Sequence, residues 1–182
     1  MTKVISMPIS TAIFHLISCR LKALNLSKPY NFLYNEADNS YSFATVNDVR
    51  YFVYFSDGSN YFPQYPDISS RVYLFGFLTQ SKIVPADSRV RDTIIKIVIE
   101  YFKNNTHNIL LYVCDTNNQQ EIHRSRKFNS WYQMVPNSGI VKLDQVISFD
   151  NNNYISILYH EHNPYAAEIN DAFTNLEKDL FK

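Results

Sequence analysis

Basic side chains are crowded into one short stretch of the chain. His123, Arg124, Arg126 and Lys127 lie within five consecutive residues. A helix through this stretch spreads them over a broad arc of its surface, where the planar donors of arginine suit a phosphate or a carboxylate. The same residues suit a solvated helix face that pairs with Glu121 or with acidic neighbours. No glycine-rich loop lies nearby, which favours the solvated face, and the anion site stays open as the alternative.

Two polar side chains stand at the end of an apolar stretch that predicts a strand over residues 109–114. Ligands of open α/β sheets gather at the carboxyl ends of parallel strands, so Cys114 and Asp115 occupy the place of a site. Asp115 is followed by Thr-Asn-Asn and also suits an ordinary turn. Cys114 has no histidine partner in the pattern and suits a small buried position. A turn is favoured for Asp115, and a catalytic role remains the alternative.

Two histidines occur with the spacing that an extended chain places on one side. His160 and His162 could ligate a metal with help from a carboxylate. No third ligand with suitable local spacing accompanies them, so the sequence predicts no metal site. A metal-assisted hydrolase that uses this pair is kept as one hypothesis for the function.

The elements that must position these residues follow from the apolar periodicity. Expected strands are 30–36, 40–46, 50–55, 71–79, 109–114, 141–149 and 154–160, and expected helices are 87–102, 119–133 and 163–181. Residues 60–70, with two prolines, are expected as a surface excursion. Residues 71–79 and 109–114 are nearly continuously apolar, which predicts strands buried on both faces. The strand–helix–strand order in the middle predicts parallel pairing. The sequence therefore predicts an α/β (α+β) fold: antiparallel N-terminal strands, a β-α-β unit and a C-terminal hairpin in one mixed sheet.

The N-terminal segment is apolar at helical spacing. Ile9, Ile13 and Ile17 repeat on one face, which predicts an amphipathic helix over residues 1–28 and a single α/β domain over residues 29–182. Residues 16–19, Leu-Ile-Ser-Cys, are similar to a lipoprotein lipobox, and an export signal is the alternative. No stretch reaches the roughly 18–20 apolar residues of a membrane span. The two cysteines lack CxxC spacing, and we expect a cytoplasmic protein with no membrane partner.

The composition bears on function. Lys plus Arg and Asp plus Glu both total 17, so no net positive charge attracts a nucleic acid, and we expect none as a partner. Only three glycines occur in 182 residues, which disfavours a site whose backbone amides wrap a phosphate. Fourteen tyrosines and thirteen phenylalanines favour a sheet with a ring-filled core.

The predicted element order resembles the GNAT acyltransferase fold. In that family the fourth strand is bulged and parts from the fifth, which opens a gap for the pantetheine arm of acetyl-CoA. Gly76, within the apolar stretch 72–78, is similar to that bulge, and residues 108–114 are similar to the fifth strand. The resemblance covers Tyr30 to roughly His160. It implies a ligand gap between the two strands, around Gly76 and Cys114.

The chain departs from that family at two positions. The family holds the pyrophosphate in an Arg/Gln-x-x-Gly-x-Gly/Ala loop, whereas residues 89–94 read Arg-Val-Arg-Asp-Thr-Ile, without glycine. The tyrosine that the family often uses as a proton donor corresponds to Phe128, although Tyr132 is close by. Both departures lower the expectation of acetyl transfer.

The resemblance still implies roles for particular residues in an enzymatic version. Beside Gly76, the phosphates of acetyl-CoA would be held by Arg89, Arg91 and Arg124. Tyr132 or Asp115 would then manage the proton on the acceptor amine.

A second resemblance concerns two local patterns. Asp-x-Arg-Val-x-x-Thr-Ile over residues 87–94, together with Arg-x-Arg-Lys-Phe-x-x-Trp-Tyr over residues 124–132, resembles a family of uncharacterised small bacterial proteins. Our leading hypothesis is a GNAT-like module without catalysis that requires no cofactor and binds a partner, such as another protein. The alternatives are an acyl-CoA-dependent N-acyltransferase with a degenerate pyrophosphate loop, and the metal-assisted hydrolase.

Overall fold

The computed structural model describes residues 26, 28–81, 83–114, 120–149 and 151–180. Nearly all of the helix expected over residues 1–28 lies outside these ranges, and so does Asp115. The division into an N-terminal helix and a domain over residues 29–182 therefore stays a prediction.

Seven strands of the described chain form one sheet in the order β1-β2-β3-β4-β5-β7-β6. They are β1 (Leu33–Asn35), β2 (Ser40–Ala44), β3 (Arg50–Asp57), β4 (Val72–Thr79), β5 (Ile109–Cys114), β6 (Ile140–Phe149) and β7 (Asn151–His160). Every neighbouring pair is antiparallel except β4 and β5, which run parallel. The predicted α+β class, with its central β-α-β unit and C-terminal hairpin, is confirmed.

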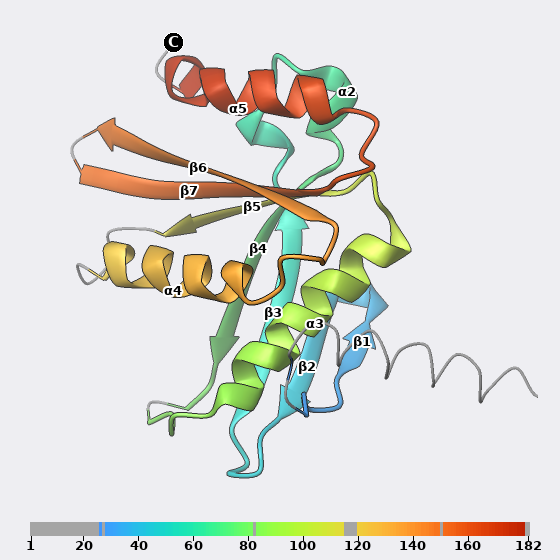
Figure 1. Ribbon diagram of the computed structural model, residues 1–182, viewed down its shortest axis with the longest axis vertical. Coiled ribbons are helices and arrows are strands. Elements are labelled where there is room, and N and C mark those ends of the chain that lie inside the picture. The colour runs from blue at the N-terminus through green and yellow to red at the C-terminus, as the bar shows by residue number, and fades with distance from the viewer. Residues whose placement is uncertain (1–25, 27, 82, 115–119, 150, 181–182) are drawn as a thin grey trace, which may run out of the picture.

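Helices lie on both faces of this sheet. They are α2 (Pro66–Ser69), α3 (Ser88–Asn104), α4 (Glu121–Gln133) and α5 (Ala166–Leu180), with single 3-10 turns at η1 (Glu36–Asp38) and η2 (Ser59–Tyr61). Figure 1 shows α3 and α4 on one face, and α5 beside α2 on the other, over the half formed by β5, β7 and β6. None of the helices among the described residues has both the length and the apolar character that a bilayer crossing requires.

Helix α3 forms where the sequence predicts it, because a capping residue and an apolar pattern both favour a helix there. The side chain of Asp87 accepts a hydrogen bond from the Arg89 amide (2.9 Å), which caps the first turn. Apolar residues lie on nearly every side, and Ile97 and Phe102 are almost fully buried. The helix ends at Asn104, two residues later than predicted.

The strands divide their side chains between two cores. Leu110 and Tyr112 of β5 point to the face that carries α3 and α4, while Ile109 and Leu111 pack with α5. Burial on both faces, predicted for this strand, is therefore confirmed. The same prediction for β4 is wrong at its far end, where Leu78 is 49% exposed.

Other expectations at the edges of elements are corrected by local packing. Residues 60–70 are more than a surface excursion, because Phe62 and Ile68 are buried beneath α5. The first strand, expected over residues 30–36, is limited to Leu33–Asn35, since the Asn35 side chain accepts from the Ala37 amide and starts a 3-10 turn.

Candidate functional site

The two parallel strands separate after a short paired segment. Their pairing covers only three positions, which end at Leu74 opposite Leu111, although β4 continues to Thr79 and β5 to Cys114. Beyond that point β4 stays in register with β3, and β5 stays in register with β7. The expected divergence next to Gly76 is therefore present.

Gly76 does not form the expected bulge. The pairing of β3 with β4 runs residue for residue through Tyr54 opposite Gly76, with no extra residue in either strand. A Cβ atom at Gly76 would overlap the hydroxyl end of the Tyr54 side chain. The glycine therefore makes room for the Tyr54 ring, which packs across β4.

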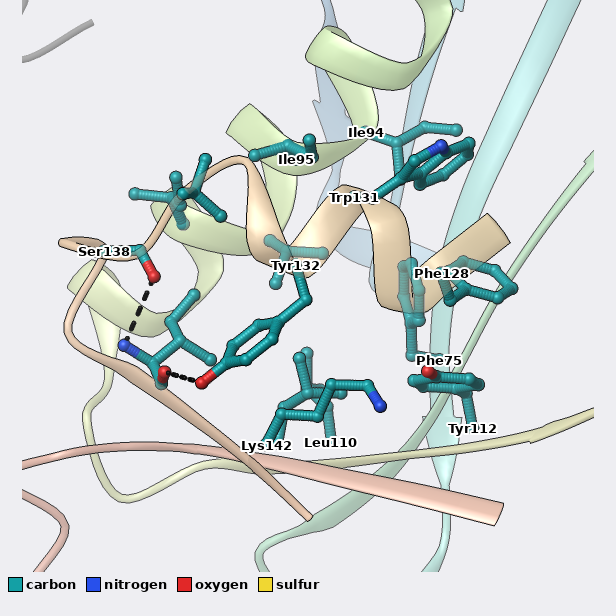
Figure 2. Close-up of a pocket in the computed structure, with 15 residues that line it drawn as sticks. Phe75, Ile94, Ile95, Leu110, Tyr112, Phe128, Trp131, Tyr132, Ser138 and Lys142 are labelled. Carbon is teal, nitrogen blue, oxygen red and sulfur yellow. Dashed lines mark hydrogen bonds between the residues drawn. The ribbon is translucent and has the colours of Figure 1, made fainter. Parts of the chain in front are cut away.

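Aromatic rings occupy the space where the strands part. Phe75 and Phe77 of β4 and Tyr112 of β5 meet Phe128 and Trp131 of α4 on the α4 side of the sheet. The ring centroids of Tyr112 and Phe128 are 4.6 Å apart, and those of Phe128 and Trp131 are 5.2 Å apart. Tilted and edge-on contacts of this kind add to the burial energy of the rings. Figure 2 shows Phe75, Tyr112 and Phe128 at one end of a small apolar cavity.

This first cavity lies between α3, α4 and the sheet and has a volume of about 60 Å³. Its walls are almost entirely aliphatic and aromatic, and Tyr132, Ser138 and Lys142 contribute the polar groups. The Tyr132 hydroxyl donates a hydrogen bond to the Ile140 carbonyl (3.0 Å), a contact drawn in Figure 2. This hydrogen bond therefore connects α4 to the start of β6.

The arginines expected to hold phosphates have partners within the chain. Arg89 donates from Nε to the Lys28 carbonyl (2.6 Å), and its guanidinium lies 3.9 Å from the Tyr30 ring centroid. Arg91 pairs with Asp92 at 2.7 Å. Arg124 lies in the first turn of α4 and, like the other two, does not line the first cavity.

The amino end of α3 is occupied by the chain's own carboxylate. Asp87 accepts from the Arg89 amide and, at 2.6 Å, from the Tyr30 hydroxyl. A helix amino end attracts anions through its free amides and its dipole. Here Asp87 fills that position.

A polar cluster lies beneath α4, and we did not expect it from the sequence. Tyr112, Ser156 and Asp144 are directly opposite one another across β5, β7 and β6. The Ser156 hydroxyl donates to Asp144 Oδ1 (2.5 Å), and the Lys142 ammonium bonds the same oxygen and the side-chain oxygen of Asn129 (2.5 Å). These five residues are called the polar cluster below.

The charges of the polar cluster are unequally buried. The Lys142 side chain is only 2% exposed, whereas that of Asp144 is 51% exposed. The buried ammonium therefore depends on a carboxylate that is itself half in water.

The Tyr112 hydroxyl is buried and makes no hydrogen bond of ordinary geometry. Burial raises the pKa of this hydroxyl well above its usual 10.0. The nearby Ser156 hydroxyl lowers it, and the Asp144 carboxylate raises it. Tyr112 is therefore neutral throughout the physiological range.

A second, larger cavity lies between α4 and the β6–β7 hairpin, and Asp144 is part of its wall. Its volume is about 350 Å³, and its walls include Arg126, Asn129, Asp144, Gln145, Tyr154 and Ser156. Polar residues from α4, β6 and β7 thus meet around one space.

The histidine pair is held by local contacts. The His162 amide donates to His160 Nδ1 (3.1 Å), and His162 Nε2 lies 3.8 Å from Glu161 Oε1. In the part of the chain that the structure describes, no group of three or more His, Cys, Asp or Glu side chains is arranged to hold a metal ion.

The structure thus places the predicted site residues at separate locations. Tyr132 lines the first cavity, Gly76 lies under Tyr54, Arg89 and Arg91 are on α3, and Arg124 is on α4. Asp115 lies outside the described residues. One sequence signal could have indicated the polar cluster: Lys142 and Asp144 alternate within a predicted strand and so share one face.

Comparison with known proteins gives one family. Residues 86–175 match a family of unknown function, DUF6169. The match runs from the start of α3 into α5 and includes all members of the polar cluster. It agrees with the expected resemblance to a family without a known activity. No curated protein and no solved structure matches the chain.

Proposed function

We propose that the protein is a binding module on a GNAT-like sheet and that it does not transfer acyl groups. The strand order, the single parallel pair that separates, and the positions of α3 and α4 support the GNAT-like part of the proposal. Fold alone does not define an activity, so the functional part rests on the residues at the place of the acyl-CoA.

One observation carries the proposal: the chain's own groups fill the positions that acyl-CoA would need. The pantetheine arm would pass between β4 and β5, where Phe75, Phe128 and Tyr112 pack together. The adjoining cavity of about 60 Å³ has room for only a few water molecules, since one requires about 10–15 Å³. A pantetheine arm is far larger than this space.

The phosphate end meets a second obstacle. A pyrophosphate at the amino end of α3 would face the Asp87 carboxylate, which already receives two hydrogen bonds. Arg89 would have to leave both Tyr30 and the Lys28 carbonyl to reach it. These contacts support a module that takes no acetyl-CoA.

Binding is supported by the polar cluster and the cavity beside it. A volume of about 350 Å³ falls within the range of small-molecule pockets, which are about 300–1,000 Å³. A small ligand therefore suits this space better than the protein partner expected from the sequence, which would require an extended exposed patch.

Titration calorimetry with acetyl-CoA tests the proposal. We expect no saturable heat at a concentration of about 1 mM, which corresponds to binding weaker than about −4 kcal/mol. The Asp87→Asn variant gives a more stringent test of acetyl-CoA binding, because it removes the charge that opposes a phosphate. Saturable binding of acetyl-CoA to the unaltered protein, lost in Arg89→Gln, would instead establish the acyltransferase alternative. Elemental analysis of the purified protein tests the metal-assisted hydrolase.

A further inference from the structure

We infer that the cavity beneath α4 binds the zwitterion of a free α-amino acid with an apolar side chain. The inference rests on the proposed function and names its ligand class. It depends on how two opposite charges, and the apolar walls between them, are placed around the cavity.

The positive charge is Arg126. It lies on α4, is exposed, and lines the cavity. Among the described residues the structure gives it no hydrogen bond and no ion pair. A free guanidinium presents two parallel N–H donors, the arrangement that a carboxylate accepts. The carboxylate of a ligand would therefore bind at this end.

The negative charge is Asp144, which lines the same cavity from β6. Its Oδ1 atom receives both Lys142 and Ser156, while Oδ2 has no hydrogen-bond partner among the described residues. Half of the side chain is exposed, so this oxygen can accept from a ligand ammonium. The ammonium of a ligand would therefore bind at this end.

Arg126 and Asp144 do not pair with each other, although both line one cavity. A molecule with a carboxylate and an ammonium on neighbouring atoms could satisfy both, whereas a simple anion or amine would satisfy only one.

Lys142 shares the Asp144 carboxylate with the ligand, because its ammonium bonds Oδ1 and leaves Oδ2 available. Its ammonium is buried against Asn129 and Asp144, and it lines the first cavity rather than the second.

The remaining walls are apolar. Ile122 of α4 and Val146 of β6 line the cavity and are 39% and 46% exposed. An aliphatic ligand side chain would cover this surface, since apolar area removed from water is favourable. These walls favour a leucine-like side chain over a charged one.

Titration calorimetry with four related probes tests the inference. L-Leucine carries both charges, leucinamide lacks the carboxylate, 4-methylpentanoate lacks the amine, and inorganic phosphate offers only an anion. We expect leucine to bind at a concentration of about 1 mM or below, and the other three to bind at least about tenfold more weakly. Phosphate binding as tight as that of leucine would overturn the inference, and so would the absence of leucine binding.

Two variants locate the site. Arg126→Gln should weaken leucine binding at least about tenfold and leave leucinamide unchanged, because only leucine loses a partner. Arg50→Gln, an exposed arginine at the start of β3, is the matched control and should bind leucine normally. Unchanged leucine affinity in Arg126→Gln would refute the site.

The acetyl-CoA titration separates the two proposals. Acetyl-CoA binding would contradict the proposed function itself. If neither acetyl-CoA nor leucine binds, the inference about the ligand fails, while the argument against acyl transfer stands.

Discussion

Because the Lys142 ammonium is buried and the Asp144 carboxylate is half exposed, we expect the loss of one partner to destabilise the protein more than the loss of the other. Replacing Asp144 with alanine leaves a positive charge that is 2% exposed without its carboxylate. Breaking a fully buried ion pair costs about 3–5 kcal/mol. Asp144 is half exposed and Asn129 keeps its hydrogen bond to Lys142, so we expect a smaller loss, about 2 kcal/mol, for Asp144→Ala.

The opposite substitution should cost less. Lys142→Met keeps the aliphatic stem against the Tyr112 ring and removes the charge that has to be buried. Asp144 keeps the Ser156 hydroxyl and contact with solvent, so no charge is stranded. We expect Lys142→Met to lie within about 1 kcal/mol of the unaltered protein. The double variant should resemble Lys142→Met rather than the sum of the two changes.

Urea unfolding followed by circular dichroism measures these differences, with the free energy of unfolding taken from the midpoint and slope. Glu100→Ala is the matched control, because it breaks a contact on α3 (2.9 Å) whose lysine, Lys103, is 37% exposed and is not buried like Lys142. We expect it to cost about 0.5 kcal/mol or less. Equal losses for Lys142→Met and Asp144→Ala would refute the account of a buried charge held by its partner.

Three further predictions concern aromatic residues around the separating strands. Gly76→Ala should destabilise by about 1–2 kcal/mol because its methyl group meets the Tyr54 ring, and adding Tyr54→Ser should recover much of this loss in urea unfolding. Phe128→Ala should cost about 2–3 kcal/mol in the same assay, since it removes the ring that contacts both strands; a loss below about 1 kcal/mol would contradict the packing described. Tyr112→Phe should be neutral or stabilising by up to about 1 kcal/mol at neutral pH, because it deletes a buried hydroxyl without a partner. The effect of Tyr112→Phe on stability should change with pH. Because the pKa of Tyr112 is raised, the folded state keeps the hydroxyl proton above pH 10, whereas the unfolded state loses it. The free energy of unfolding of the unaltered protein should therefore fall as pH rises above about 10. That of Tyr112→Phe should fall less steeply, by up to about 1.4 kcal/mol per pH unit. Parallel pH profiles would contradict the burial of this group.

Local signals were sufficient to predict much of the fold. Asp87 followed by an apolar segment predicts the start of α3, and the continuous apolar character of residues 109–114 predicts a strand buried on both faces. Parallel pairing and separation near Gly76 were also expected, although Tyr54 gives that glycine a different physical reason.

The candidate site was harder to predict because it depends on packing between distant elements. Asn129 meets Lys142 only when α4 lies over β6, and the sequence does not state which face of the hairpin a helix will cover. The contacts of Arg89 with Tyr30 and Lys28 likewise join segments about sixty residues apart. Residue type alone made Arg89 and Arg91 resemble phosphate ligands, whereas their partners are other groups of this chain.

We propose that the chain's own rings and the Asp87 carboxylate exclude acyl-CoA, and that the cavity beneath α4 binds a small ligand. Amide chemical shifts of the ¹⁵N-labelled protein, recorded first with acetyl-CoA and then with L-leucine, test it most directly. We predict no saturable change with acetyl-CoA, and saturable changes with leucine confined to α4, β6 and β7. Saturable acetyl-CoA shifts in β4, β5 and the first turn of α3 would contradict the account.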